Sequence, residues 1–217
     1  ALRETDSIKR VWKAIGDKSK RCVVQVAPAI RVAIGEEFGM EPGAQVTGKL
    51  AQALRCLGFD DIFDTDFAAD LTIMEEGTEF LGRVKAAFTG GEATLPMITS
   101  CSPGWIKYIE HTFPDELDHL STCKSPHTML GALAKSFYAK QIGVDPRDMF
   151  VVSVMPCTAK KFEIGRHEMQ NDGCPNVDAV LTTRELAQMI REAGIDFAKL
   201  PDSDFDSPLG LSTGAAD

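Results

Sequence analysis

The sequence has no cysteine pair with C-x-x-C spacing, no long apolar run and no basic-then-apolar start. Its six cysteines are spread over 217 residues, which indicates a reducing, cytoplasmic compartment and thiols that are free or metal-bound. No segment approaches the roughly 18 apolar residues of a transmembrane helix, and no signal peptide is expected. A net charge of −9 disfavours unspecific binding to a nucleic-acid backbone. These absences exclude disulfide scaffolds, membrane-spanning proteins and unspecific nucleic-acid binders.

The composition is that of an ordinary globular protein. Apolar residues make up 44% of the chain and charged residues 25%, which excludes disorder, collagen and a simple coiled coil. The length suffices for one large domain or two small lobes with a hydrophobic core.

Strand-like segments alternate with segments of helical periodicity. Strands are expected at residues 22–26, 62–63, 95–99, 149–155 and 177–181. Helices are expected at residues 8–15, 29–38, 46–57 and 67–88, after Ser102-Pro103 and Ser125-Pro126, and after a capping box at Thr182–Glu185. This alternation predicts an α/β fold of largely parallel sheets flanked by helices, with a lobe boundary near residues 90–95.

Unusual residues follow three of the expected strands. These segments are Val26-Ala-Pro-Ala29, Thr99-Ser-Cys-Ser-Pro103 and Met155-Pro-Cys157. Ligands of parallel α/β sheets gather where the strands end. Cys101 also precedes a helix N-terminus, which favours its thiolate, and Lys160 brings a positive charge. The pattern indicates an anionic or metal-containing ligand, although many cysteines are simply buried.

These residues resemble a known family. Thr99-Ser-Cys-Ser-Pro-Gly-Trp105 and Met155-Pro-Cys-Thr-Ala-Lys-Lys-Phe-Glu163 are similar to the first two signature motifs of iron-only (di-iron) hydrogenases. Further segments similar to that family's catalytic domain are Val26-Ala-Pro-Ala-Ile-Arg-Val-Ala-Ile-Gly-Glu-Glu-Phe38, Ala69-Asp-Leu-Thr-Ile-Met-Glu-Glu76, Ser121-Thr-Cys-Lys-Ser-Pro126 and Leu181-Thr-Thr-Arg-Glu-Leu186. The resemblance covers nearly the whole chain. It implies the amino-terminal portion of a two-lobed catalytic domain, truncated at the C-terminus.

The resemblance implies a specific cofactor, the H-cluster. This is a 4Fe–4S cubane joined to a di-iron unit with CO, cyanide and a dithiolate amine bridge. Cys157 matches one cysteine ligand of the cubane, and Ser102 stands where the family has another. Cys101 matches the thiol that passes protons to the bridging amine. Two more ligands belong to a later motif. Either Ser102 binds iron, Cys101 takes over, or this chain holds no complete cluster; for Ser102 the competing interpretation is a plain helix N-cap.

The resemblance also implies a proton route and a cofactor pocket. The residues that match the route are Cys101, Glu76, Ser121, Glu79 and Arg83, and those that match the pocket are Ala27, Pro28, Pro126, Met155 and Lys160. The spacing of Glu76, Glu79 and Arg83 places them on one stripe of a helix. The alternative for that stripe is a solvated face with a Glu79–Arg83 ion pair. His127 stands where the family has glutamine and is expected to be a neutral hydrogen-bonding substitute.

The resemblance thus predicts a hydrogenase that reversibly reduces protons to hydrogen in anaerobic metabolism. Its expected partners are a ferredoxin or iron–sulfur subunit for electrons, and a C-terminal segment or second chain that completes the cluster. The fragment by itself is not expected to be active. One alternative is a non-catalytic sensor or an iron–sulfur assembly relative of the same superfamily. Another is an enzyme with Cys101 as nucleophile.

Overall fold

A four-stranded parallel sheet forms the centre of this computed structural model, which describes residues 5–207 and 209–212. The strand order is β2-β1-β3-β6, and every neighbouring pair is parallel. The strands are β1 (Arg21–Val26), β2 (Asp61–Asp64), β3 (Met149–Val154) and β6 (Ala179–Leu181). All four carboxyl ends therefore lie at one edge of the sheet.

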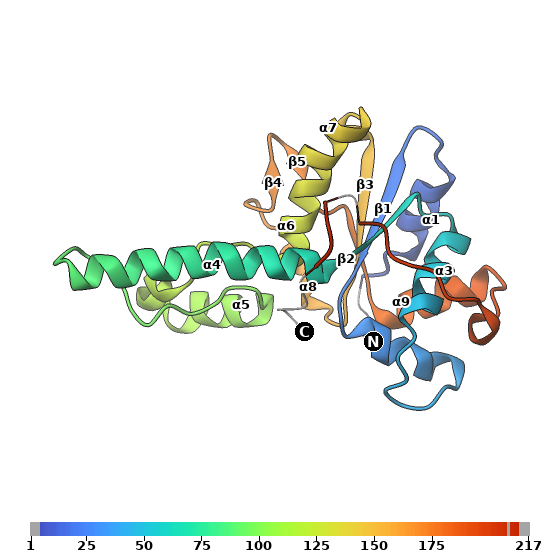
Figure 1. Ribbon diagram of the computed structural model, residues 1–217, viewed down its shortest axis with the longest axis horizontal. Coiled ribbons are helices and arrows are strands. Elements are labelled where there is room, and N and C mark those ends of the chain that lie inside the picture. Colours follow the sequence, from blue (N-terminus) through green and yellow to red (C-terminus); the bar gives the residue numbers. More distant parts are fainter. Residues whose placement is uncertain (1–4, 208, 213–217) are drawn as a thin grey trace.

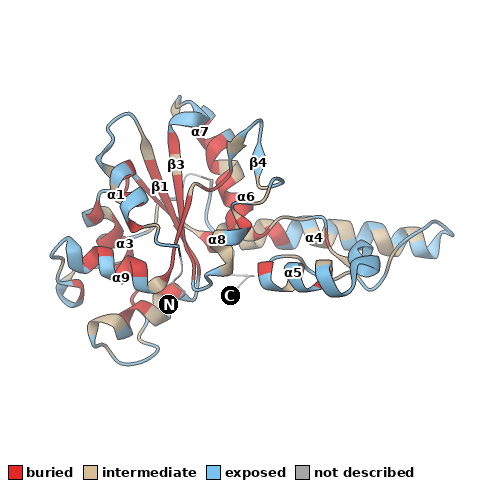
Figure 2. Cartoon of the chain, turned by 180° about the vertical axis from the view of Figure 1, so that it is seen from behind, coloured by how far each residue is buried: buried red, intermediate tan, exposed pale blue. Residues whose placement is uncertain are grey.

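Helices cover both faces of the sheet, which is why its strands are almost continuously apolar. On one side lie α1 (Ile8–Gly16), α3 (Thr47–Leu57) and α9 (Thr183–Glu192); on the other lies α6 (Pro126–Leu133) (Figure 1). Figure 2 shows that the buried residues concentrate in these strands and the helix faces turned towards them. Val24, Val152 and Leu181 are completely buried.

Shorter elements connect this frame. They are α2 (Ile30–Ala33), α5 (Pro103–Thr112), α7 (Ala139–Ile142), α8 (Ala159–Glu163), the hairpin of β4 (Gln170–Asn171) and β5 (Cys174–Pro175), 3-10 turns at Ile34–Phe38, Pro114–His119, Pro146–Asp148 and Phe197–Lys199, and a π-helical turn at Ala134–Tyr138.

One long helix, α4 (Thr65–Phe88), projects from the sheet with α5 lying alongside it (Figures 1 and 2). Its 24 residues correspond to about 36 Å of helix. Asp64 ends β2 and caps α4, because its side chain accepts a hydrogen bond from the Asp66 amide. The chain thus passes directly from the sheet edge into this projection, which we call the α4 arm (residues 65–121).

The structure confirms the α/β class and corrects several expected elements. No strand spans residues 95–99: only Ile98 pairs, in a single parallel bridge with Leu120. Pro96 has no N–H to donate to a ladder, so an apolar segment here does not suffice for a strand. The expected helix at residues 29–38 divides into α2 and a 3-10 turn. The strand expected at residues 177–181 begins at Ala179. The strand starts later because the Val151 amide donates to the Asp178 side chain at 2.8 Å, so this amide is not available for a backbone hydrogen bond of the sheet.

No helix among the described residues is both long and apolar enough to cross a membrane. The loop around residues 90–95 leads from α4 to α5 within the α4 arm. A lobe boundary at that loop stays a prediction.

Candidate active site

Two of the three unusual segments follow neighbouring strands at the carboxyl edge of the sheet. Ala27 follows β1, and its amide donates to the Val154 carbonyl at 3.0 Å. Met155 follows β3, and its amide donates to the Leu181 carbonyl at 2.9 Å. Both side chains are buried, whereas Pro28 and Cys157 are exposed just beyond them. The sheet therefore holds the backbone of this edge rigidly while presenting a proline and a thiol outward.

The third segment ends at the N-terminus of α5. Cys101 and Ser102 are both exposed, and Ser102 occupies the N-cap position with an extended backbone. Its carbonyl accepts the first helical hydrogen bond, from Ile106 at 3.0 Å, but its hydroxyl makes no capping bond. The Ser102 side chain is thus not used as an N-cap, and its oxygen remains available for another partner.

Lys160 in α8 connects these segments. Its ammonium donates to the Cys101 carbonyl at 2.6 Å, and its backbone amide donates to the Cys157 carbonyl at 3.2 Å. The ammonium also pairs with Glu163 at 2.6 Å. Cys101, Ser102 and Cys157 therefore belong to one region, although the sequence separates the first from the last by 56 positions (157 − 101).

His127 and Pro126 begin α6 beside this region. The His127 ring is buried and lies 3.1 Å through Nδ1 from the Ser153 hydroxyl. Burial lowers the pKa of His127, against the opposing effect of Glu163. The expectation of a neutral hydrogen-bonding side chain thus agrees with this environment. The ring, however, contacts Ser153 and Glu163 inside the fold, while Pro126 at the helix start is only half-buried.

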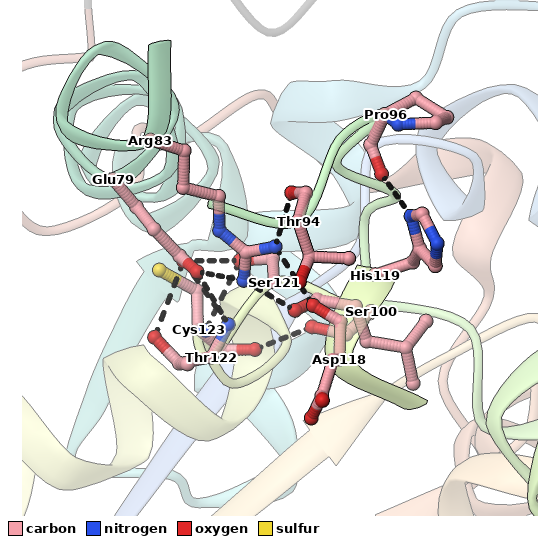
Figure 3. A network of polar contacts seen from close by, with 11 residues as sticks. Glu79, Arg83, Thr94, Pro96, Ser100, Asp118, His119, Ser121, Thr122 and Cys123 are labelled. Carbon is pink, nitrogen blue, oxygen red and sulfur yellow. Dashed lines mark hydrogen bonds and ion pairs between the residues drawn. The ribbon is translucent and has the colours of Figure 1, made fainter. Parts of the chain in front are cut away.

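A second polar cluster lies on the α4 arm (Figure 3). The Glu79 carboxylate pairs with Arg83 at 2.6 Å and accepts from the Ser121 hydroxyl at 2.9 Å. It also accepts from the amide of Thr122 at 3.0 Å. Burial raises the pKa of Glu79, but its bonds to Arg83, Ser121 and Thr122 outweigh that and hold the pKa below its usual range. Glu79 is therefore an ionised hydrogen-bond acceptor at neutral pH.

Arg83 binds two other segments of the chain to α4. Its guanidinium also donates to the carbonyls of Thr94, Asp118 and Leu120, at 3.2, 2.9 and 2.8 Å. The side chains of Glu79 and Arg83 are each only 17% exposed. The ion pair that the alternative expects is present, but it is largely shielded from solvent and fastens the segments around Thr94 and Leu120 to α4. Arginine keeps its proton, so Arg83 positions Glu79 and does not itself exchange protons.

Not every residue of the expected proton route belongs to this cluster. Glu76 is half-buried one turn earlier on α4 and makes no hydrogen bond or ion pair with any described residue. The Cys101 thiol likewise has no hydrogen bond to the described part of the chain. Sequence reasoning missed Thr122 and Cys123, although both directly follow Ser121. The Cys123 amide donates to the Ser121 hydroxyl at 3.1 Å, which directs the serine proton towards Glu79.

A pocket of about 270 Å³ lies between the two clusters. Its lining includes Ser100, Ser121 and Cys123 on one side and Glu163 and Arg166 on the other. The Ser100 hydroxyl donates to the Cys123 carbonyl at 2.6 Å, joining the segment before Cys101 to the segment after Ser121. The Ser121–Glu79 cluster and the Cys101 segment are therefore adjacent, and the pocket beside them has a largely apolar lining.

Cys101 is expected to be the first thiol alkylated by limiting iodoacetamide, and Cys22 the last. Cys101 is exposed just before a helix, where the reagent can reach its thiol, whereas burial raises the pKa of Cys22 to about 11. Burial and nearby glutamates also raise the pKa of Cys123. Peptide mapping of the labelled chain measures the order. Labelling of Cys22 or Cys123 before Cys101 would contradict the placement.

The donor atoms of this region suit iron in kind. Thiolates are the usual ligands of iron–sulfur clusters. Cys101 and Cys157 are both exposed, and Lys160 contacts the backbone carbonyls of both. Among the described residues, however, no group of three or more histidine, cysteine, aspartate or glutamate side chains could hold a metal ion. These residues therefore offer part of a ligand set.

Known proteins resemble the chain along most of its length. A family described as "Iron only hydrogenase large subunit, C-terminal domain" matches residues 20–217. An NADP-reducing hydrogenase subunit of Solidesulfovibrio fructosivorans is 56% identical over 100% of this chain and 37% of its own length. A periplasmic iron hydrogenase large subunit of Nitratidesulfovibrio vulgaris is 50% identical over 96% of this chain and 49% of its own.

More distant relatives and solved structures extend this picture. Cytosolic iron-sulfur assembly component 3 of Bos taurus is 33% identical over 89% of this chain and 41% of its own length. An apo FeFe-hydrogenase from Chlamydomonas reinhardtii superposes with a TM-score of 0.89 at 44% identity, covering 95% of this chain and 52% of that one. The chain thus spans about half the length, or less, of these relatives.

Proposed function

The chain belongs to the iron-only hydrogenase large-subunit family, and from this premise we propose that it contributes to reversible reduction of protons to hydrogen. The observation that carries the proposal is the pair of adjacent clusters, one at the carboxyl end of the sheet and the other on the α4 arm. One presents Cys101, Ser102 and Cys157, which suit iron, and the other holds an ionised Glu79 with a serine proton directed at it. The reaction needs both electron-carrying metal and a supply of protons.

The proposed cofactor is the H-cluster, for which Cys157 and Ser102 are the candidate ligands. When bound, it would supply the iron at which electrons and protons combine. Lys160 offers an ammonium whose two described partners leave one N–H for an anionic group. Ala27 and Met155 would exclude water from the sheet side, with Pro28 and Pro126 at the rim. Cys101 would hold the proton nearest the cofactor.

Within the proposed proton route, Ser121 and Glu79 exchange the proton and Arg83 positions them. Hydroxyl and carboxylate can each accept and donate in turn, which a relay requires. Glu76 would bridge from Cys101 to Ser121, and the pocket beside Ser121 has room for the side-chain movement or water that this step needs.

The proposed partners are an electron donor and a segment that completes the site. The first follows from the name of the NADP-reducing relative, a subunit of a larger enzyme, and a ferredoxin or iron–sulfur subunit would serve. The second is favoured by apolar side chains that α4 leaves exposed. They are Ile73 (49%), Met74 (70%), Phe80 (44%), Leu81 (67%) and Phe88 (88%). Such a stripe indicates an interface, because single exposed apolar residues are normal but contiguous patches are not.

A cytoplasmic location is part of the proposal. One relative carries the word periplasmic in its name, so compartment differs within the family. An assembly or sensor role is the second candidate, and the Bos taurus assembly component shares 33% identity with this chain, against 56% for the hydrogenase subunit. The connected Ser121–Glu79–Arg83 cluster favours the enzyme, since a binding protein has no need of a proton route.

Anaerobic reconstitution with iron and sulfide tests the proposed ligands. Cys157→Ala should reduce bound iron per chain, whereas Cys56→Ala, an exposed thiol elsewhere, should not. Ser102→Cys should increase iron retention, because thiolate suits iron better than hydroxyl and no capping bond is lost. Cys101→Ala keeps the iron if Cys101 only carries a proton, and loses it if Cys101 is a ligand. Equal iron in the parent, Cys157→Ala and Ser102→Cys would overturn the ligand assignment.

A further inference from the structure

Glu163, the last residue of α8, is a buried carboxylate that accepts hydrogen bonds from three side chains. It is 4% exposed. One oxygen accepts from the hydroxyl of Ser125 and also from the hydroxyl of Thr128, the latter at 3.2 Å. The other accepts from the Lys160 ammonium at 2.6 Å. Both oxygens are therefore satisfied, as a buried charge requires.

These donors come from two segments of the candidate site, the start of α6 and α8 itself. Ser125 immediately precedes Pro126 at the start of α6. Lys160 reaches across to the Cys101 carbonyl at 2.6 Å, 59 positions away in the sequence. Its own backbone is joined to Cys157. One carboxylate thus links the Cys101 segment, the start of α6 and the segment that follows β3.

Two basic side chains, Lys160 and His127, lie close to the Glu163 carboxylate, and Lys160 is its charged partner. His127 approaches the same carboxylate oxygen as Lys160, with Nε2 at 3.3 Å, but the ring is buried and burial lowers its pKa. Burial raises the pKa of Glu163, but its contacts with His127, and after them those with Lys160, more than reverse this and bring the pKa to about 2. Because burial favours a neutral His127, the Lys160 ammonium supplies the positive charge beside this carboxylate. The two side chains are only 13% and 5% exposed.

We infer that Glu163 is a positioning residue of the candidate site: its carboxylate holds the Lys160 ammonium against the Cys101 carbonyl and so fixes Cys101 and Ser102 relative to Cys157. Without that carboxylate, the ammonium would turn towards water, because an unpaired charge is costly to bury. The Cys101 segment would then lose its only described side-chain tether from α8. The catalytic meaning of this role rests on the proposed function; the tether itself does not.

The test compares Glu163→Gln with a matched control in the chain without cofactor. Glutamine keeps the shape and the hydroxyl contacts but removes the charge. We expect the Lys160 amine to be acylated at least about tenfold faster, since a charge-assisted bond is lost. Hydrogen exchange of the Ile106 amide, which donates to the Ser102 carbonyl, should accelerate as well. Tandem mass spectrometry separates Lys160 from Lys161.

Glu185→Gln is the control, because Glu185 pairs with the neighbouring Lys161 at 2.6 Å with side chains 11% and 7% exposed. It should expose Lys161 while leaving Lys160 and Ile106 unchanged. If Glu163→Gln does not fold, Lys160→Met replaces it. This variant has no amine to acylate at position 160, so its readout is faster hydrogen exchange of the Ile106 amide. Unchanged Lys160 acylation and Ile106 exchange in Glu163→Gln, or equal changes in Glu185→Gln, would overturn the inference. None of these readouts depends on iron, so they are independent of whether the proposed function fails.

Discussion

Hydrogen turnover should fall about 10²–10⁴-fold in an active preparation that carries Glu79→Gln, the range expected for loss of a general acid–base group. Glutamine fills the same space between Ser121 and Arg83 but cannot take up and release a proton. The parent carboxylate is ionised at neutral pH because Arg83, Ser121 and Thr122 lower its pKa more than burial raises it. Hydrogen evolution with excess reductant measures the effect, and iron content per chain separates it from cofactor loss.

The matched control for this prediction is Glu75→Gln. Glu75 lies on the same helix but is exposed, so its replacement should change turnover little. The pH dependence of unfolding provides a second readout for Glu79. Its folded-state pKa lies below the unfolded value, so its contribution to stability is present above the unfolded pKa and disappears as the pH falls through the folded pKa. Glu79→Gln should remove that acid-side dependence. Unimpaired turnover in Glu79→Gln would remove Glu79 from the proton route.

Gly131→Ala should destabilise the chain by about 3 kcal/mol, at the upper end of the range for overpacked sites. Gly131 lies in α6, where the helix approaches the loop before β6 very closely. A Cβ there would lie 2.4 Å from the Asn176 carbonyl oxygen and 2.8 Å from Val177 Cγ2. Since the nearest atom is backbone, rotation of a side chain cannot relieve the clash. Denaturant unfolding monitored by circular dichroism measures the loss.

Gly82→Ala is the control for this substitution and should have the opposite sign. Gly82 lies in α4, and nothing comes within 4 Å of a Cβ built there. Alanine is the better helix former by roughly 0.8–1 kcal/mol, so this variant should be slightly more stable. Equal changes in the stability of the two variants would contradict a close contact between α6 and residues 176 and 177.

Local patterns in the sequence were sufficient for the main elements. The apolar runs of β1 and β3 predicted buried strands, because parallel strands covered on both faces need apolar side chains throughout. Thr182 and Glu185 predicted the start of α9, and the structure contains the complete capping box. Such signals involve residues only a few positions apart, so the sequence states them directly. The strand expected at 95–99 failed because apolar character does not guarantee a partner with free hydrogen-bonding groups.

The sequence by itself therefore determined the α/β class, most helix and strand positions, and, through its motifs, the family. Only the tertiary structure decided how the site residues connect. Arg83 binds carbonyls 11 to 37 positions away, and Glu163 accepts directly from a hydroxyl 38 positions away. Ser102 occupies the N-cap position of α5, as its sequence position predicts, but its hydroxyl makes no capping hydrogen bond. Contacts of this kind depend on how α4, α5, α6 and α8 pack together, and no local period or spacing encodes that packing.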